Sequence, residues 1–277
     1  MGAIIWLASY PKSGNTWMRA FLHNLLMNAQ EPVDINSLHY FTLGEGNPRF
    51  YKPFAARPLN ELPESEIMAL RPKVHELLTQ TSPDSVFVKT HHFLGEIDDM
   101  PLITMAHTAG AIYVVRNPLD VVLSYASHFG VSADRAIEEL ANNGNGSKPS
   151  DQNMRQYYGS WSLNVGSWTQ NTMPTLHVVR YEDMQDRPSE TFAGVARFLG
   201  LDPPRERLER AIANASFGAL KTQEEAHGFV ERTEHARFFR EGQSGAWRTA
   251  LSDRQVAKVV ADHRQQMARF GYVPDGL

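Results

Sequence analysis

The stretch that decides the fold is AIIWLASYPKSGNTW, residues 3–17 of the 277-residue chain. Ala3 to Ala8 is apolar without interruption, which is typical of a strand buried on both faces of a parallel sheet. Turn-forming residues follow up to Gly14, and from Asn15 apolar residues recur at helical spacing. The order strand, loop, helix predicts the first half of a βαβ unit.

The same alternation recurs along the chain. Short apolar runs at residues 86–88, 111–115 and 176–179 are expected to be strands. Helices are expected from Pro118, over 188–199 and over 252–270, with Ser252 as a cap and Gly200 and Gly271 as stops. Residues 31–63 and 141–150 are expected to be irregular. We therefore predict an α/β fold, one domain over residues 1–277, with a central parallel sheet flanked by helices on both faces.

Composition limits the classes of function. A net charge of −4 gives no support for a nucleic-acid partner. The absence of cysteine excludes disulfides, thiolate nucleophiles and cysteine-based zinc sites, and it fits a reducing compartment. The N-terminus makes a poor signal peptide, and no apolar run reaches the roughly 18 residues of a spanning helix. We expect a cytoplasmic protein without a transmembrane segment.

The loop at residues 10–17 is expected to bind an anion. Backbone N–H groups and the positive end of a helix converge at such a junction. Lys12, Ser13, Asn15 and Thr16 add side-chain donors. The Walker pattern is absent, because Lys12 precedes Gly14 instead of following it. A phosphate site without a metal is the interpretation that we favour, and an incidental tight turn is the alternative.

Polar residues also follow the other strands. Lys89 and His91 project to the same side of an extended segment, so a fixed charge lies beside a group that titrates near neutral pH. Arg116 and Ser124 suit a second phosphate, although Arg116 could instead pair with Asp120 at the surface. For His91, a purely structural role is the alternative. Residues 238–248, FFREGQSGAWR, form a glycine-containing loop that is weak evidence alone.

Together these segments resemble the cytosolic-type sulfotransferase family over residues 3 to about 250. Residues 10–17, YPKSGNTW, are similar to its 5′-phosphosulfate loop, and KTH at 89–91 is similar to its catalytic strand end. Residues 116–124 resemble R-x-P-x-D-x-x-x-S, and 181–183 resemble Y-E-D. Ser216-Phe217 and Arg240-Glu241-Gly242 resemble T-S-F and R-K-G. The resemblance implies a P-loop NTPase-like sulfotransferase fold, with 3′-phosphoadenylyl sulfate (PAPS) as donor, adenosine 3′,5′-bisphosphate (PAP) as product, and no metal.

The resemblance also implies residue roles. His91 would take the acceptor's proton, Lys12 would stabilise the leaving phosphate, and Lys89 would contact the sulfuryl oxygens. Ser124 would hold the 3′-phosphate and restrain Lys12 until an acceptor arrives, and Trp17 would stack on the adenine. The full set of donor-binding residues is Lys12, Ser13, Gly14, Asn15, Thr16, Trp17, Arg116, Ser124, Tyr181, Ser216, Phe217, Phe239, Arg240 and Gly242.

Three departures from the family pattern stand out. Glu241 replaces a lysine, which is unfavourable beside a phosphate, and Ala246 replaces an aspartate. The dimer motif K-x-x-x-T-V is reduced to RTALSD at 248–253, so a homodimer is left open. A small-molecule kinase on a related scaffold and a non-catalytic nucleotide-binding module are the rival hypotheses.

The acceptor is a small molecule of unassigned class. Its pocket is expected from residues 31–63 and 130–155. The aromatic residues of these segments suggest an apolar or sugar-facing site, and packing is the equally frequent alternative for aromatic residues in loops. Phenols, aliphatic alcohols, glycolipids and glycosylated natural products all stay open.

Overall fold

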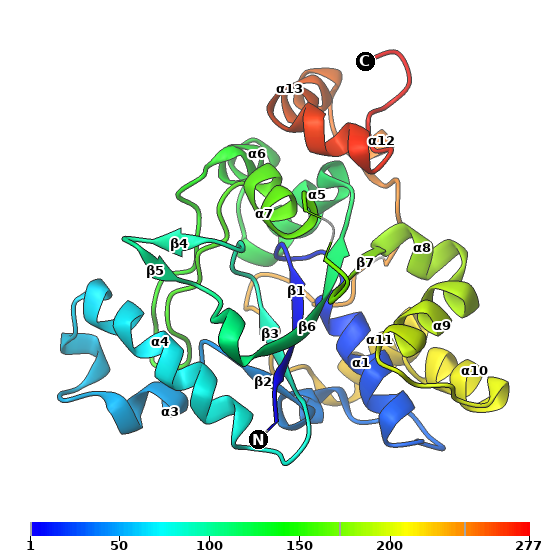
Figure 1. The fold of residues 1–277 in the computed structure, drawn as a ribbon. Helices are drawn as coiled ribbons and strands as arrows, with labels where there is room; N and C mark the ends of the chain where they lie inside the picture. Colours follow the sequence, from blue (N-terminus) through cyan, green and yellow to red (C-terminus); the bar gives the residue numbers. More distant parts are fainter. Residues whose placement is uncertain (1, 172, 241) are drawn as a thin grey trace.

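A five-stranded parallel sheet forms the centre of the computed structural model, which describes residues 2–171, 173–240 and 242–277 (Figure 1). The strand order is β2-β3-β1-β6-β7, and every neighbouring pair runs parallel. Because the carboxyl ends of all five strands lie at one edge, the segments that follow them are brought together. The strands are β1 (Ile4–Ser9), β2 (Thr42–Gly44), β3 (Val86–Thr90), β6 (Thr108–Val115) and β7 (Leu176–Arg180).

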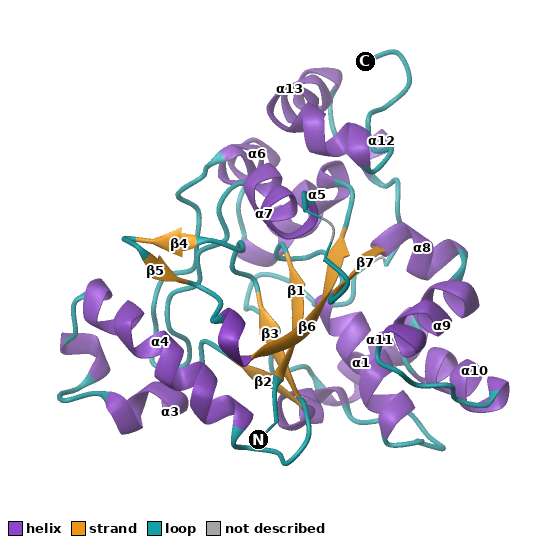
Figure 2. Ribbon diagram, viewed as in Figure 1, coloured by secondary structure: helices purple, strands orange, loops and turns teal. Residues whose placement is uncertain are grey.

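Helices cover both faces of the sheet (Figure 2). Side chains of β1 alternate between the two layers: Trp6 and Ala8 join one buried cluster, and Leu7 joins the other. The first cluster is completed by α4 (Glu64–Thr79), α5 (Pro118–Phe129), α6 (Ala133–Ala141), α7 (Trp161–Thr169) and α13 (Asp253–Arg269). The second is completed by α1 (Asn15–Leu26), α8 (Tyr181–Asp186), α9 (Pro188–Phe198), α10 (Arg205–Asn214) and α11 (Phe217–His227).

The predicted elements are confirmed, with boundary shifts of a few residues. The four expected strands are β1, β3, β6 and β7, and helices begin at Asn15, Pro118 and Pro188. Ser252 caps α13 in a reciprocal capping box with Gln255. Gly200 and Gly271 adopt φ values of 71° and 68° where their helices end. The α/β class and the two-sided layering are therefore as the sequence predicts, and the single-domain assignment over 1–277 stays a prediction.

The prediction that residues 31–63 are irregular is wrong in part. This segment forms the short helices α2 (Leu38–Phe41) and α3 (Pro48–Tyr51), and β2 pairs with β3 as an edge strand. Three residues are too few to show a period in the sequence. The same holds for the hairpin of β4 (Glu96–Ile97) and β5 (Met100–Pro101) and for α12 (Trp247–Ala250). Residues 142–150 form a loop, as expected.

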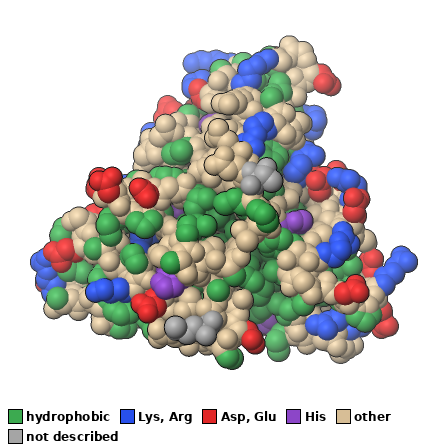
Figure 3. Space-filling view, viewed as in Figure 1, with side chains coloured by type: hydrophobic (Ala, Val, Ile, Leu, Met, Phe, Trp, Pro, Cys, Tyr) green, Lys and Arg blue, Asp and Glu red, His purple; other side chains and the backbone are tan. Residues whose placement is uncertain are grey.

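The face in Figure 3 carries most of its charged side chains at the periphery, with hydrophobic side chains gathered in the middle. Among the described helices, each is too short or too polar to cross a bilayer.

Candidate active site

A cavity of about 600 Å³ lies where the loops after the parallel strands converge. The phosphate-type loop after β1, the end of β3, and the segment from the end of β6 into α5 all line it. Its wall includes most of the residues that the sequence singled out: Lys12, Gly14, Asn15, Thr16, Trp17, Lys89, His91, Arg116, Ser124, Tyr181, Phe217, Phe239, Arg240 and Gly242. Residues from six separate segments are thus brought to one site.

The loop at residues 10–17 has a backbone that only particular residues tolerate. Lys12 and Gly14 adopt φ values of 67° and 105°, in the left-handed region. Gly14 is required for a second reason, because a Cβ there would lie 2.6 Å from Cδ2 of Tyr181. The Asn15 amide donates to the carbonyl of Leu7 at 2.8 Å, so this side chain braces β1. The prediction that Asn15 donates its side chain to an anion is corrected accordingly.

Three buried donors around this loop are left without a partner among the described residues. They are Oγ of Ser13, Nε1 of Trp17 and Nε of Arg116. A buried donor without a partner costs free energy, and a site that binds a polyanion can satisfy such donors. The indole of Trp17 also packs edge-on against Tyr181, with ring centroids 5.6 Å apart. These residues fit an anionic nucleotide.

The Lys12 ammonium lies in an apolar niche. It donates to Nδ1 of His128 at 3.3 Å and sits 3.7 Å above the ring centre of Phe238. Burial, and then the charge of Lys89, lower the pKa of Lys12 to about 7. The expected restraint by Ser124 is replaced by one from His128, one turn further along α5.

The His91 ring is held in one orientation. Nδ1 donates to the carbonyl oxygen of Ser9 at 2.8 Å, which leaves the lone pair of Nε2 free of that bond. The Tyr158 ring stands edge-on to His91 at 6.1 Å. Burial, and then the charge of Lys89, lower the pKa of His91 to about 3, so the ring is neutral at physiological pH. A neutral, oriented imidazole can accept a proton.

Lys89 belongs to a charged triad in the cavity wall. Its ammonium lies 3.2 Å from Glu231, and the Arg19 guanidinium lies 2.6 Å from the other oxygen of the same carboxylate. Burial alone would raise the pKa of Glu231, but Lys89 and Arg19 hold it below its usual range. The triad carries one net positive charge at the position between the phosphate loop and β3.

Arg116 holds two segments together at the end of β6. Its guanidinium donates to the carbonyl of Lys12 at 3.2 Å and to that of Gln243 at 3.3 Å, and it stacks 4.1 Å above the ring centre of Tyr181. Asp120 instead accepts from the backbone N–H of Gly245 at 2.8 Å. The described residues therefore decide against the alternative in which Arg116 pairs with Asp120 at the surface.

The segment at 238–248 covers the cavity from the C-terminal side. Gly242, at φ 62°, fits against Phe217 so closely that a Cβ would lie 2.2 Å from that ring. Phe217 in turn packs edge-on against Phe239 at 6.0 Å. Ser216 caps α11 with its hydroxyl and does not line the cavity, so its predicted donor contact is not brought about by this geometry. Glu241 lies outside the described residues.

A model of the sulfotransferase domain matches residues 4–271. The chain belongs to the sulfotransferase family. It is a sulfotransferase that uses PAPS as donor and releases PAP. The motif resemblance and the function class predicted from it are thereby confirmed, and the kinase alternative falls.

The relatives are distant in sequence, but their similarity extends over nearly the whole of this chain. Sulfotransferase 1A1 of dog is 25% identical over 96% of this chain and 83% of its own length. Flavonol 3-sulfotransferase of Flaveria bidentis is 24% identical over 92% of this chain and 78% of its own length. A mouse sulfotransferase, SULT7A1, solved with PAP, superposes with a TM-score of 0.62 at 19% identity, covering 96% of this chain and 84% of that one. The structural likeness supports the fold.

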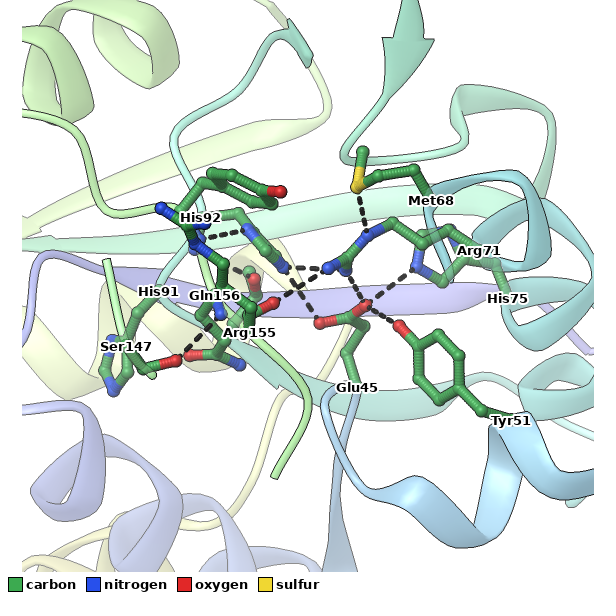
Figure 4. A network of polar contacts seen from close by, with 12 residues as sticks. Glu45, Tyr51, Met68, Arg71, His75, His91, His92, Ser147, Arg155 and Gln156 are labelled. Atoms are coloured by element: carbon green, nitrogen blue, oxygen red, sulfur yellow. Dashed lines mark hydrogen bonds and ion pairs between the residues drawn. The ribbon is translucent and has the colours of Figure 1, made fainter. Parts of the chain in front are cut away.

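A second charged network of the sulfotransferase gathers around Glu45 and Arg71 and includes His92, just after the end of β3 (Figure 4). Arg71 forms an ion pair with Glu45, and His92 is hydrogen-bonded to the same carboxylate; all three are 0% exposed, and Tyr51 and His75 complete the cluster. His92 accepts from the N–H of Tyr157 at Nδ1 and meets Glu45 at Nε2, 3.0 Å away. Both of its ring nitrogens are engaged. In Figure 4 His91 points away from this network, so the two neighbouring histidines serve different environments.

Sequence reasoning missed four residues of the site: Arg19, His128, Glu231 and Phe238. Arg19 left no signal, because position 19 falls outside the apolar stripe of Met18, Phe21 and Leu22, where a charged residue is ordinary in a helix. Glu231 left none, since its partners are distant in sequence.

Proposed function

We propose that this sulfotransferase transfers the sulfuryl group to a hydroxyl or amine of a small-molecule acceptor, with His91 as the general base. The observation that carries the proposal is the bond from Nδ1 of His91 to the Ser9 carbonyl, which fixes the tautomer with an unprotonated Nε2. The cavity wall around it supplies the basic side chains of Lys12, Lys89 and Arg116. A base among cations suits a reaction in which negative charge develops on the transferred group.

Two regions of the cavity hold the two ends of the donor. The loop at 10–17 would bind the 5′ end, with Lys12 at the leaving phosphate and Lys89 at the sulfuryl oxygens. Arg116, Ser124, Arg240 and the N–H of Gly242 would hold the 3′-phosphate. Trp17, Tyr181, Phe217 and Phe239 would enclose the purine, because they form one aromatic wall. Positioning and electrostatics dominate such a transfer.

The oligomeric state and the cellular location belong to the same proposal. We propose a cytoplasmic enzyme that does not act on nucleic acid, in keeping with a net charge of −4 and the absence of cysteine from the sequence. A homodimer stays open, and it would need a contact other than the altered family motif at 248–253.

Thermal unfolding with ligands tests the site. PAP at about 100 times its dissociation constant is expected to add about 2.7 kcal/mol to the free energy of unfolding. ATP with Mg²⁺ is expected to add less, because no Walker lysine follows Gly14. The reverse order would overturn the assignment of this cavity as the donor site.

A further inference from the structure

One wall of the cavity is far more polar than the sequence suggests. The aromatic residues of the segment 31–63 were expected to face the acceptor, but they are used elsewhere. Phe50 and Tyr51 are buried in the core, Phe41 stacks on His23, and Tyr40 is 74% exposed outside this cavity. Of the two roles that the sequence left open for these rings, the structure therefore favours packing over contact with the acceptor.

Amides and hydroxyls take the place of those rings. Asn47, Ser147, Ser150, Gln152, Asn153 and Gln156 line the cavity from two loops that touch where the N–H of Met154 donates to the carbonyl of Gly46 at 2.7 Å. Among the described residues, no side-chain bond is formed by the amides of Gln152, Asn153 and Gln156. An amide both donates and accepts, as a sugar hydroxyl does. A flat phenol or sterol offers fewer hydroxyl groups to these amides than a saccharide does.

Two cations stand on the same wall without carboxylate partners. Arg49 and Lys148 are exposed, line the cavity, and form no ion pair with any other described residue. The carboxylates in the described wall are Asp120 and Glu231, and both are engaged, by backbone N–H groups and by Lys89 with Arg19. This wall is therefore net positive.

The strand order separates Arg49 from the cations at the donor end. Arg49 lies in α3, which follows β2, and Arg116 follows β6; these two strands are three spacings apart, about 14 Å. His91 follows β3, between them. The positive charge near Arg49 thus lies on the far side of the base from the donor's phosphates.

We propose that the acceptor is a hydroxyl-rich molecule bearing an anionic group, namely an acidic saccharide or its glycoside. This inference rests on the proposed function, because His91 must serve the hydroxyl. The acceptor oxygen forms a bond to sulfur, the bond from sulfur to the donor's phosphate oxygen breaks, and the hydroxyl proton passes to Nε2 of His91. The amides hold the remaining hydroxyls, while Arg49 and Lys148 hold the anion.

A matched pair of acceptors tests the proposal. Initial rates are measured with labelled PAPS on 4-nitrophenyl β-D-glucuronide, on 4-nitrophenyl β-D-glucoside, in which a neutral CH2OH group replaces the carboxylate, and on 2-naphthol. We expect kcat/KM to be roughly tenfold higher for the glucuronide than for the glucoside, as for a charge-assisted hydrogen bond, with 2-naphthol lowest.

Variants assign the preference to the wall. Lys148→Ala and Arg49→Ala are expected to reduce the glucuronide preference, measured as the ratio of kcat/KM on the glucuronide to kcat/KM on the glucoside, to about threefold or less. Lys148→Arg should keep it. Lys73→Ala, at an exposed lysine of α4 outside the cavity, is the control and should change nothing.

The outcomes separate the two proposals. Equal rates on the two glycosides, a preference for 2-naphthol, or no turnover of any of the three would overturn the acceptor class if PAP still stabilises the protein. Loss of PAP binding would instead count against the donor site itself.

Discussion

Two clusters of polar and charged side chains lie on either side of the end of β3. One is open to the cavity, and the other is closed to solvent. In the cavity, Glu231 and Lys89 are each 24% exposed at the side chain. Behind the strand, Glu45, Arg71 and His92 are 0% exposed. Exposure leaves the first group able to meet a ligand. The second is saturated by its own members, so it can only hold the backbone in place.

The comparison assigns different tasks to adjacent histidines. His91 uses one nitrogen for the Ser9 carbonyl, and His92 uses both, for Tyr157 and Glu45. The end of β3 thereby presents His91 to the cavity on one side, and on the other side His92, which ties the backbone to the buried network. Burial alone therefore does not tell the two histidines apart. What distinguishes His91 is a ring nitrogen on the cavity side that no protein group uses.

The largest expected effect is that of His91→Ala on turnover. Loss of the base is expected to lower kcat by about 10²–10⁴-fold, while the dissociation constant of PAP changes by less than about threefold. Steady-state kinetics and calorimetric titration measure the two quantities. The matched variant is His92→Asn, which should lower the melting temperature and leave kcat of the folded enzyme within about tenfold of the parent. A larger kcat loss for His92→Asn would break the contrast.

Next in size is the stability difference between the two acidic residues. Glu45→Gln removes one partner of a fully buried network and is expected to cost about 3–5 kcal/mol of unfolding free energy. Glu231→Gln, in the partly open triad, is expected to cost about 1–2 kcal/mol. Urea denaturation of both variants measures this. Equal losses would show that the cavity triad is as structural as the closed network.

The smallest expected effect is a pH dependence of donor affinity. In the protein without ligand, burial lowers the pKa of Lys12 to about 7. The ammonium therefore loses its proton as the pH rises through that value. PAP binds the charged form, so its affinity should fall by up to about tenfold per pH unit above pH 7. Lys12→Met should bind weakly and lose this slope. Titration between pH 7 and 9 measures it, above the range in which the phosphates of PAP titrate.

How much of the fold and of the site can be predicted from the sequence depends on how far apart in the chain the interacting residues lie. The loop at 10–17 and the caps at Ser252 and Gly271 are local, so residue type and spacing were enough to predict them. The members of the Glu45 network come from three separate segments, and nothing local distinguishes Glu45 from a surface carboxylate. For a related reason the sequence could not decide whether the aromatic residues of 31–63 face the acceptor. Only packing determines whether such a ring faces the core or the cavity.

The fit between Gly14 and Tyr181 has a consequence for the order in which the chain is made. The donor loop leaves the ribosome first, yet the ring that packs on it comes more than 160 positions later, directly after β7. Glu182 follows and accepts from the N–H of Asn117 at 3.0 Å, which ties the end of β6 to the same late segment. A partly translated chain consequently lacks the packing that completes the loop.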